Sequence, residues 1–89
     1  MLRGLGGNDL LTGGTGNDLL IGNEGDDILR GTGGNDIAQG GAGNDSLNGG
    51  GGNDFLDGQE GNDFFVGIGG TDTIIGLSLI HISEPTRPY

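Results

Sequence analysis

The sequence predicts an all-β fold, a right-handed parallel β-roll (a β-solenoid) of about four coils with two nine-residue units in each coil. Three observations predict it. Eight nine-residue units follow one another from Gly4 to Ile75 without insertion or deletion. Positions one and four of every unit are glycine, and position eight is always apolar. With 24 glycines and only 30% hydrophobic residues, the 89-residue chain cannot fill a thick core, so order must come from stacking of the units.

Positions one to six of each unit are expected to form a turn. Glycine at positions one and four permits positive φ and close approach of the backbone. Position five is Asn in six units, Asp26 in one and Thr71 in another. Asn and Asp tolerate the left-handed region and bond their own backbone, so we expect position five to help close the turn.

Positions seven to nine are expected to form a three-residue strand. Side chains alternate along a strand, so position eight would face inward and positions seven and nine outward. Such a strand is unstable alone and requires copies stacked in register, with two units closing one coil. The inward residues are Leu11, Leu20, Leu29, Ala38, Leu47, Leu56, Phe65 and Ile74. The apolar residues at position seven are Leu10, Leu19, Ile28, Ile37, Phe55 and Phe64. They would form either a scattered exposed surface or a docking stripe for further domains.

Position six supplies candidate metal ligands, because it is Asp in every unit: Asp9, Asp18, Asp27, Asp36, Asp45, Asp54, Asp63 and Asp72. Stacking of alternate units would place them in two rows with neighbours about 5 Å apart. Two carboxylates at that range repel by on the order of 3 kcal/mol at an effective dielectric constant of 20. The chain has a net charge of −10, and Arg30 is the one basic residue between positions 4 and 75. No protein cation can therefore neutralise the rows.

A divalent cation with a preference for oxygen can neutralise them, and Ca²⁺ fits best. It accepts six to eight oxygen ligands at about 2.3–2.6 Å, including the backbone carbonyls that glycine-rich turns expose. Mg²⁺ prefers strict octahedral geometry, and Zn²⁺ prefers His and Cys, which the repeat lacks. About six sites are expected, and Asp26 is a candidate accessory ligand. The predicted pairs are Asp9/Asp27, Asp27/Asp45, Asp45/Asp63, Asp18/Asp36, Asp36/Asp54 and Asp54/Asp72.

Other functions find less support in the residues. Aspartates that are merely solvated in turns are the main alternative, which the uniform spacing and the missing counter-charge disfavour. Glycoside hydrolysis uses a pair of carboxylates in a cleft, but here identical pairs of aspartates recur along the chain and no cleft is predicted. No catalytic residue is predicted. The acidic charge argues against nucleic acid, and no apolar run is long enough for a membrane span. An adhesive or ice-binding surface, or a disordered glycine-rich spacer, remains a further alternative.

The unit G-G-x-G-x-D-x-U-x, where U is apolar, resembles the RTX (repeats-in-toxin, hemolysin-type) calcium-binding nonapeptide. The resemblance covers residues 4–75, with position two departing from Gly except at Gly14, Gly41 and Gly50. It implies a right-handed parallel β-roll with Ca²⁺ between the turns, held by the position-six aspartates and turn carbonyls. It also implies a secreted, extracellular bacterial protein that leaves the cell by type I secretion and folds in external calcium.

The resemblance implies a module without catalytic activity of its own. The alternative is the C-terminal array of a secreted enzyme, such as a serralysin-like protease, a lipase or an alginate epimerase, or of an adhesin or toxin. The expected partners are calcium ions and further domains of a parent protein, and the sequence gives no indication of oligomeric state.

The ends of the chain depart from the repeat. Residues 1–3 fit the end of a preceding partial repeat, so we expect the array to continue upstream, and no cleavable N-terminal signal is visible. The β-roll is expected over residues 4–76. Residues 77–89, LSLIHISEPTRPY, resemble a translated sequencing-adaptor scar. Their first half could add a capping strand, and Pro85 and Pro88 would keep the rest irregular.

Overall fold

The computed structural model describes residues 1–66, 72–76 and 80–82, and these contain ten β-strands and no helix. In chain order the strands are β1 (Leu2–Arg3), β2 (Leu10–Thr12), β3 (Leu19–Ile21), β4 (Ile28–Arg30), β5 (Ile37–Gln39), β6 (Ser46–Asn48), β7 (Phe55–Gln59), β8 (Asp63–Val66), β9 (Thr73–Gly76) and β10 (Ile80–Ile82). Most have three residues, as the length of the repeat predicts. The described residues hold no helix that is long and apolar enough to cross a membrane.

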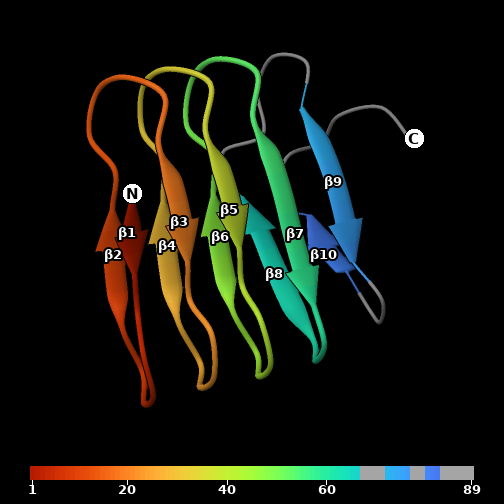
Figure 1. Ribbon diagram of the computed structural model, residues 1–89. Helices are drawn as coiled ribbons and strands as arrows, with labels where there is room; N and C mark the ends of the chain where they lie inside the picture. The colour runs from red at the N-terminus through yellow and green to blue at the C-terminus, as the bar shows by residue number, and fades with distance from the viewer. Residues whose placement is uncertain (67–71, 77–79, 83–89) are drawn as a thin grey trace.

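The strands form two parallel five-stranded sheets. The odd-numbered strands make one sheet in the order β1-β3-β5-β7-β9, and the even-numbered strands make the other in the order β10-β8-β6-β4-β2. The chain alternates between the sheets and advances by one layer every two strands (Figure 1). The predicted all-β parallel solenoid of about four turns is therefore confirmed.

From β1 to β8, each strand residue lies beside its equivalent eighteen positions later. The C-terminal pairs depart from this interval, because the β7–β9 register shifts between Asp57 and Gln59 and Ile80 on β10 lies beside Asp63 on β8. Leu20 pairs with Ala38 in one sheet, and Leu11 pairs with Leu29 in the other. The pairing continues past the strand ends. The position-seven N–H donates to the position-six carbonyl of the preceding coil, as from Ile28 to Asp9 at 2.8 Å. This continuity gives the backbone at each strand start a partner in the adjacent coil, which a three-residue strand could not provide alone.

The core is a single column of position-eight side chains between the sheets. Its seven buried members are Leu11, Leu20, Leu29, Ala38, Leu47, Leu56 and Phe65. Ile74 is partly buried against them. The inward direction of position eight is therefore as predicted.

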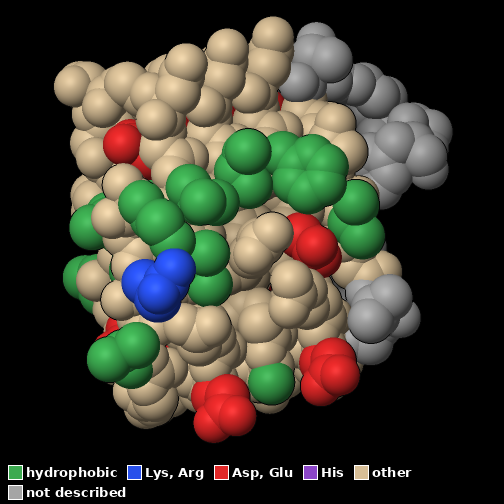
Figure 2. All heavy atoms as spheres, in the orientation of Figure 1, with side chains coloured by type: hydrophobic (Ala, Val, Ile, Leu, Met, Phe, Trp, Pro, Cys, Tyr) green, Lys and Arg blue, Asp and Glu red, His purple; other side chains and the backbone are tan. Residues whose placement is uncertain are grey.

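Position seven faces outward on both sheets. Leu10 is 61% exposed, and Ile37 and Phe55 are 44% and 37% exposed. Ile37 and Phe55 are paired on adjacent strands, and Figure 2 shows a hydrophobic band running across the strands on the face toward the viewer. The exposed apolar side chains of this face are therefore contiguous.

The turns differ from the sequence-based expectation in which positions take positive φ. Position four does so in every described unit, as at Gly25 with φ 105°. Position two does so from the second to the seventh unit, even where it carries a side chain, as at Asn23 (φ 69°) and Thr32 (φ 68°), but not at Leu5. No described residue at position one or position five has positive φ, so the left-handed conformation is not used there. Of the two reasons for glycine at position one, close approach is the one that the structure shows.

The strand β10 pairs in parallel with β8, with His81 beside Phe64 in the backbone register. The rest of the C-terminal segment with the adaptor-like sequence, residues 77–79 and 83–89, lies outside the described residues.

Candidate metal centre

The position-six aspartates close each turn directly before a strand, and the fold sorts them into two rows. Turns that lead from the odd-numbered to the even-numbered sheet carry one row, and turns that lead back carry the other. The first row is Asp9, Asp27, Asp45 and Asp63. The second row is Asp18, Asp36, Asp54 and Asp72. The two sets of turns lie at opposite edges of the β-roll (Figure 1), so the rows are separated by the full length of the strands.

The rows are buried along most of their length. Five aspartates, from Asp27 to Asp63, are between 1% and 4% exposed, although Asp residues are seldom buried without a partner. Asp9 and Asp18 at the N-terminal end and Asp72 near the other end are partly exposed. Burial therefore depends on having a coil on either side.

One carboxylate oxygen of each inner aspartate has a clear partner. Oδ1 accepts a hydrogen bond from the backbone N–H of the aspartate one coil earlier, as from Asp27 to Asp45 at 2.8 Å. The same bond joins all six adjacent pairs, at 2.7–2.9 Å. The structure thus brings together the six predicted pairs, and it links them through the backbone and not through contact of two carboxylates.

The other carboxylate oxygen, Oδ2, is buried and has no hydrogen-bond partner among the described residues, and this holds for all eight aspartates. Buried oxygens that can only accept are costly when left unpaired. Burial raises the pKa of Asp45 to about 7 and the pKa of Asp54 to about 6, since the backbone N–H bond offsets only part of the desolvation and the neighbouring carboxylates add to it. The pKa values of Asp27, Asp36 and Asp63 are raised for the same first reason. The rows therefore favour any positive charge that can reach Oδ2.

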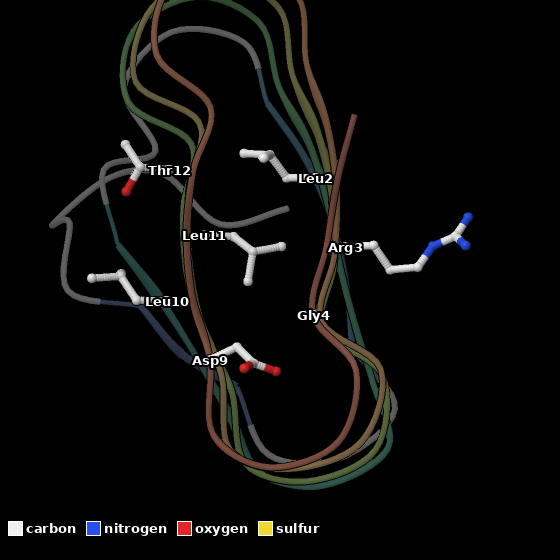
Figure 3. A pocket seen from close by; sticks show the side chains of 7 residues that line it. All are labelled: Leu2, Arg3, Gly4, Asp9, Leu10, Leu11 and Thr12. Carbon is white, nitrogen blue, oxygen red and sulfur yellow. The ribbon is translucent and has the colours of Figure 1, made fainter.

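Two of the unpartnered oxygens lie against a glycine that also faces a backbone carbonyl of the next coil. A Cβ added at Gly22 would lie 2.7 Å from Oδ2 of Asp27 and 2.8 Å from the carbonyl oxygen of Gly40. The same arrangement recurs at Gly4, where Oδ2 of Asp9 and the carbonyl oxygen of Gly22 lie 2.6 and 3.0 Å away from the added atom. Oxygens from two coils therefore converge beside the Cα of Gly4 and Gly22, and at the other described position-one glycines the Asp side chain of the same unit lies against the added atom. Figure 3 shows the Asp9 carboxylate pointing inside the turn toward the Gly4 side.

The donor set fits calcium. It consists of carboxylate and carbonyl oxygens without nitrogen or sulfur, which is what a hard divalent cation prefers. Within residues 1–66, 72–76 and 80–82, no three acidic, His or Cys side chains gather closely enough to hold a metal by themselves. A site therefore needs oxygens besides those of the aspartates, and the turn carbonyls are the ones that the chain offers, as expected for Ca²⁺ more than for a metal that needs side-chain ligands.

A second hydrogen-bonded row at position five was missed from the sequence. The side-chain oxygen accepts the position-five N–H of the following coil, as from Asn35 to Asn17 at 2.8 Å, in each of the first five units. Asp26 belongs to this row, because its Oδ1 accepts the N–H of Asn44 at 2.8 Å. The six Asn residues of this column indicated a repeated hydrogen bond, but the sequence-based prediction placed that bond within the turn and not between coils.

The N-terminal end of the β-roll is hollowed where the stack of coils begins. The hollow has a volume of 490 Å³, and its lining includes Leu2, Asp9 and Leu11. Figure 3 shows Leu2 and Leu11 pointing toward each other across it. It is the open end of the core, with the first aspartate at its edge.

Comparison with known families agrees with this geometry. The model of the RTX calcium-binding nonapeptide repeat (four copies) matches residues 3–38 and 30–65, which together cover most of the chain. Searches of curated proteins and of solved structures found no match. A repeat domain of this kind is a structural calcium-binding module and is not catalytic. The chain therefore belongs to the RTX calcium-binding nonapeptide repeat family.

Proposed function

We propose that this chain is a calcium-dependent folding and stabilising element, in which Ca²⁺ binds between successive turns along both rows of aspartates. The observation that carries the proposal is the set of eight buried Oδ2 atoms without hydrogen-bond partners among the described residues. Each of them lies at the edge of a glycine-rich turn, and at Gly4 and Gly22 a carbonyl oxygen of the next coil lies beside it.

The ligands in this proposal are the position-six aspartates, with backbone carbonyls of the turns. About six sites would lie between the pairs Asp9/Asp27, Asp27/Asp45, Asp45/Asp63, Asp18/Asp36, Asp36/Asp54 and Asp54/Asp72. Bound calcium supplies the positive charge that these oxygens lack. The chain's own contribution is to hold the oxygens in place, because Oδ1 of every aspartate after the first in each row is fixed by a backbone N–H, and each strand is fixed by its neighbours. Asp26 would contribute through its charge near the second coil, since its Oδ1 is already bonded to Asn44.

Binding of this kind is linked to folding. A ligand that binds only the folded chain adds stability that grows with its concentration, so several sites bound together give a steep dependence on calcium. In the absence of calcium the rows keep their raised pKa values and their unpaired oxygens, which oppose stacking of the coils. We therefore expect an expanded chain without calcium and an ordered β-roll with it.

This dependence suits a protein that is exported unfolded and meets calcium outside the cell. RTX repeats are typical of type I-secreted bacterial proteins, so we place this module in an extracellular bacterial protein, where it would stabilise attached domains. The alternative is that the module is the C-terminal array of a secreted enzyme, adhesin or toxin whose active domain is encoded elsewhere in the gene. The sequence flanking this chain in its gene separates the two.

The test is a calcium titration followed by far-ultraviolet circular dichroism, with magnesium as the control and a chelator to reverse the change. We expect a cooperative gain of β-structure below about 10⁻² M calcium and little change with magnesium. A spectrum that stays the same up to tens of millimolar calcium, or a β-roll that is as stable in the chelator as in calcium, contradicts the proposal.

A further inference from the structure

The two edges of the β-roll differ in the negative charge that they carry besides the position-six aspartates. The turns of the first row contain three further acids, Glu24, Asp26 and Glu60, whereas the turns of the second row contain no acid except the aspartates of that row. All three additional side chains are exposed. Figure 2 shows acidic side chains along the lower edge of the molecule, where Figure 1 places the turns of the first row. The first row therefore lies at the more acidic edge.

Charges from outside the row reach the buried aspartates of the first row. Burial is the main cause of the raised pKa of Asp27 and of Asp45, and the negative charge of Asp26 raises both pKa values further. A fourth acid, Asp57, lies on β7 directly before a turn of the first row, and it acts in the same direction on the pKa of Asp63, again after burial. These acids are therefore close enough to act on a cation bound to the same oxygens.

The second row has no comparable neighbours. Among the described residues, the carboxylates that raise the pKa of Asp36 and Asp54, after burial, all belong to the second row itself. Arginines do not offset the difference, because Arg3 directly precedes a turn of the first row and Arg30 directly precedes a turn of the second. Figure 3 shows Arg3 pointing out of the coil, away from the Asp9 carboxylate. The edges therefore differ in their acids and not in their bases.

We propose that calcium binds the first row more tightly than the second and fills it first, because the additional acids of its turns attract the cation. The inference rests on the proposed function. Both rows have the same buried Oδ2 atoms without hydrogen-bond partners among the described residues, so the ligands themselves do not distinguish them. Every space between coils in the first row borders a turn that contains Glu24 and Asp26 or a turn that contains Glu60. Nearby negative charge strengthens calcium binding, so the first edge is ordered at a lower calcium concentration than the second.

The experiment moves one charge from the first edge to the second without changing the net charge. Asp26→Asn gives position five the residue that most units have there, and Asn35→Asp places a carboxylate at the equivalent position of the second row. Both changes keep the shape of the side chain. Oδ1 of each residue accepts a backbone N–H of the following coil, and either side chain can make that bond. The fold should therefore tolerate the double variant.

The measurement is a calcium chloride titration of the isotope-labelled chain by nuclear magnetic resonance. The amide signals of Gly25 and Gly34 report on turns of the first and second rows. At about 0.01 M salt, where charges are poorly screened, Gly25 should reach its midpoint at a roughly fivefold lower calcium concentration than Gly34. The double variant should narrow this difference to about twofold, and so should about 0.15 M salt in the unchanged chain.

Release of calcium from the loaded chain keeps the test decisive if cooperative folding makes the two midpoints coincide. A fluorescent chelator should remove calcium in a fast phase from the second row and a slow phase from the first. Asp26→Asn alone should accelerate the slow phase, and Asn35→Asp alone should retard the fast phase. Glu24→Gln, which removes the charge of an exposed side chain in the turn of Asp26, should act like Asp26→Asn and replaces the double variant if that chain does not fold.

The outcomes separate the inference from the function on which it rests. A chain that binds no calcium overturns the proposed function. A chain that binds calcium with equal midpoints and a single release phase, or that fills the second row first, overturns the inference alone. A difference between the rows that persists unchanged in Asp26→Asn, in Glu24→Gln and at higher salt also overturns it, because the difference would then not come from the additional acids.

Discussion

The column of apolar side chains and the rows of aspartates share one period, yet their chemistry is opposite. Each position-eight side chain is buried by its neighbours above and below and needs nothing else. Each position-six side chain is buried in the same way, but only one of its two oxygens is satisfied. The same stacking that stabilises the core therefore creates the need for a cation in the turns. Register comes from the core, and the dependence on metal comes from the turns.

Shortening a side chain of the core should have the largest effect on the free energy of unfolding. Phe65 is the largest fully buried side chain, and Phe65→Ala should cost about 3–5 kcal/mol of unfolding free energy with calcium present, which a small chain can barely tolerate. The measurement is urea unfolding followed by circular dichroism. Phe55→Ala, at the outward position seven, is the control and should cost much less. Equal losses would mean that the core column is not what sets the register.

The second prediction concerns pH in the absence of metal. The pKa of Asp45 in the folded chain, about 7, lies above its ordinary value of 3.8, so protonation favours the folded state. This stabilisation is complete below about pH 3.8 and is lost as the pH rises through about 7. Raising the pH from about 5 to about 8 in a chelator should therefore lower the unfolding free energy by on the order of 2 kcal/mol for this group.

The matched variant for the pH prediction is Asp45→Asn, which keeps the shape of the side chain and removes its titration. Its urea midpoint in the chelator should depend less on pH than that of the unchanged chain. In calcium the variant should be the less stable of the two, because a ligand of two sites is lost. A higher midpoint at pH 8 than at pH 5 for the unchanged, metal-free chain would contradict the assignment of the buried carboxylates.

A methyl group beside the converging oxygens tests the turn without changing charge. In Gly22→Ala the added atom meets Oδ2 of Asp27 and the carbonyl oxygen of Gly40, and overpacking of this kind costs about 1–3 kcal/mol. Gly33→Ala, where the added atom meets nothing within 4 Å, should be neutral or slightly stabilising. Calorimetric melting in calcium measures both. A harmless Gly22→Ala would mean that the oxygens do not converge there.

The smallest predicted effect is a gain. Thr32→Asn keeps a donor for the carbonyl of Gly14 and replaces a β-branched residue at φ 68° by one that tolerates this conformation, as Asn23 does at the same position. The unfolding free energy should rise by roughly 0.5 kcal/mol, because left-handed strain is relieved. Melting in a chelator and in calcium should both show the gain. A loss in both conditions would show that the hydroxyl makes a contact that Asn cannot replace.

The repeat determined how much of this molecule could be predicted. Columns that are identical in every unit, such as Gly at position four and Asp at position six, specify what each coil must share, and they predicted the core, the two sheets and the pairing of Asp27 with Asp45. The direction of hydrogen bonds between coils depends on the offset of one coil over the next, which no single column encodes. For this reason the Asn row at position five was mistaken for bonding within the turn.

Position two illustrates a different limit. Its residues vary among Gly, Asn, Thr, Gln, Leu and Ile, so periodicity gave no signal there. The positive φ at Asn23, Thr32 and Gln59 is imposed by the turn and not by their side chains. Individual coils therefore differ from one another at position two, the column of the turn that varies most.

The pattern of bonds between coils recurs every eighteen residues, which makes the length of this molecule adjustable in whole steps. Each of the six bonds between aspartates joins residues eighteen apart, and the strand register repeats the same interval. A duplication or loss of eighteen residues in the gene would leave each remaining coil with neighbours of the same kind. A change of nine would move every later strand to the opposite sheet. Tandem duplication of eighteen residues should therefore leave the structure nearly unchanged, whereas duplication of nine residues should disrupt it.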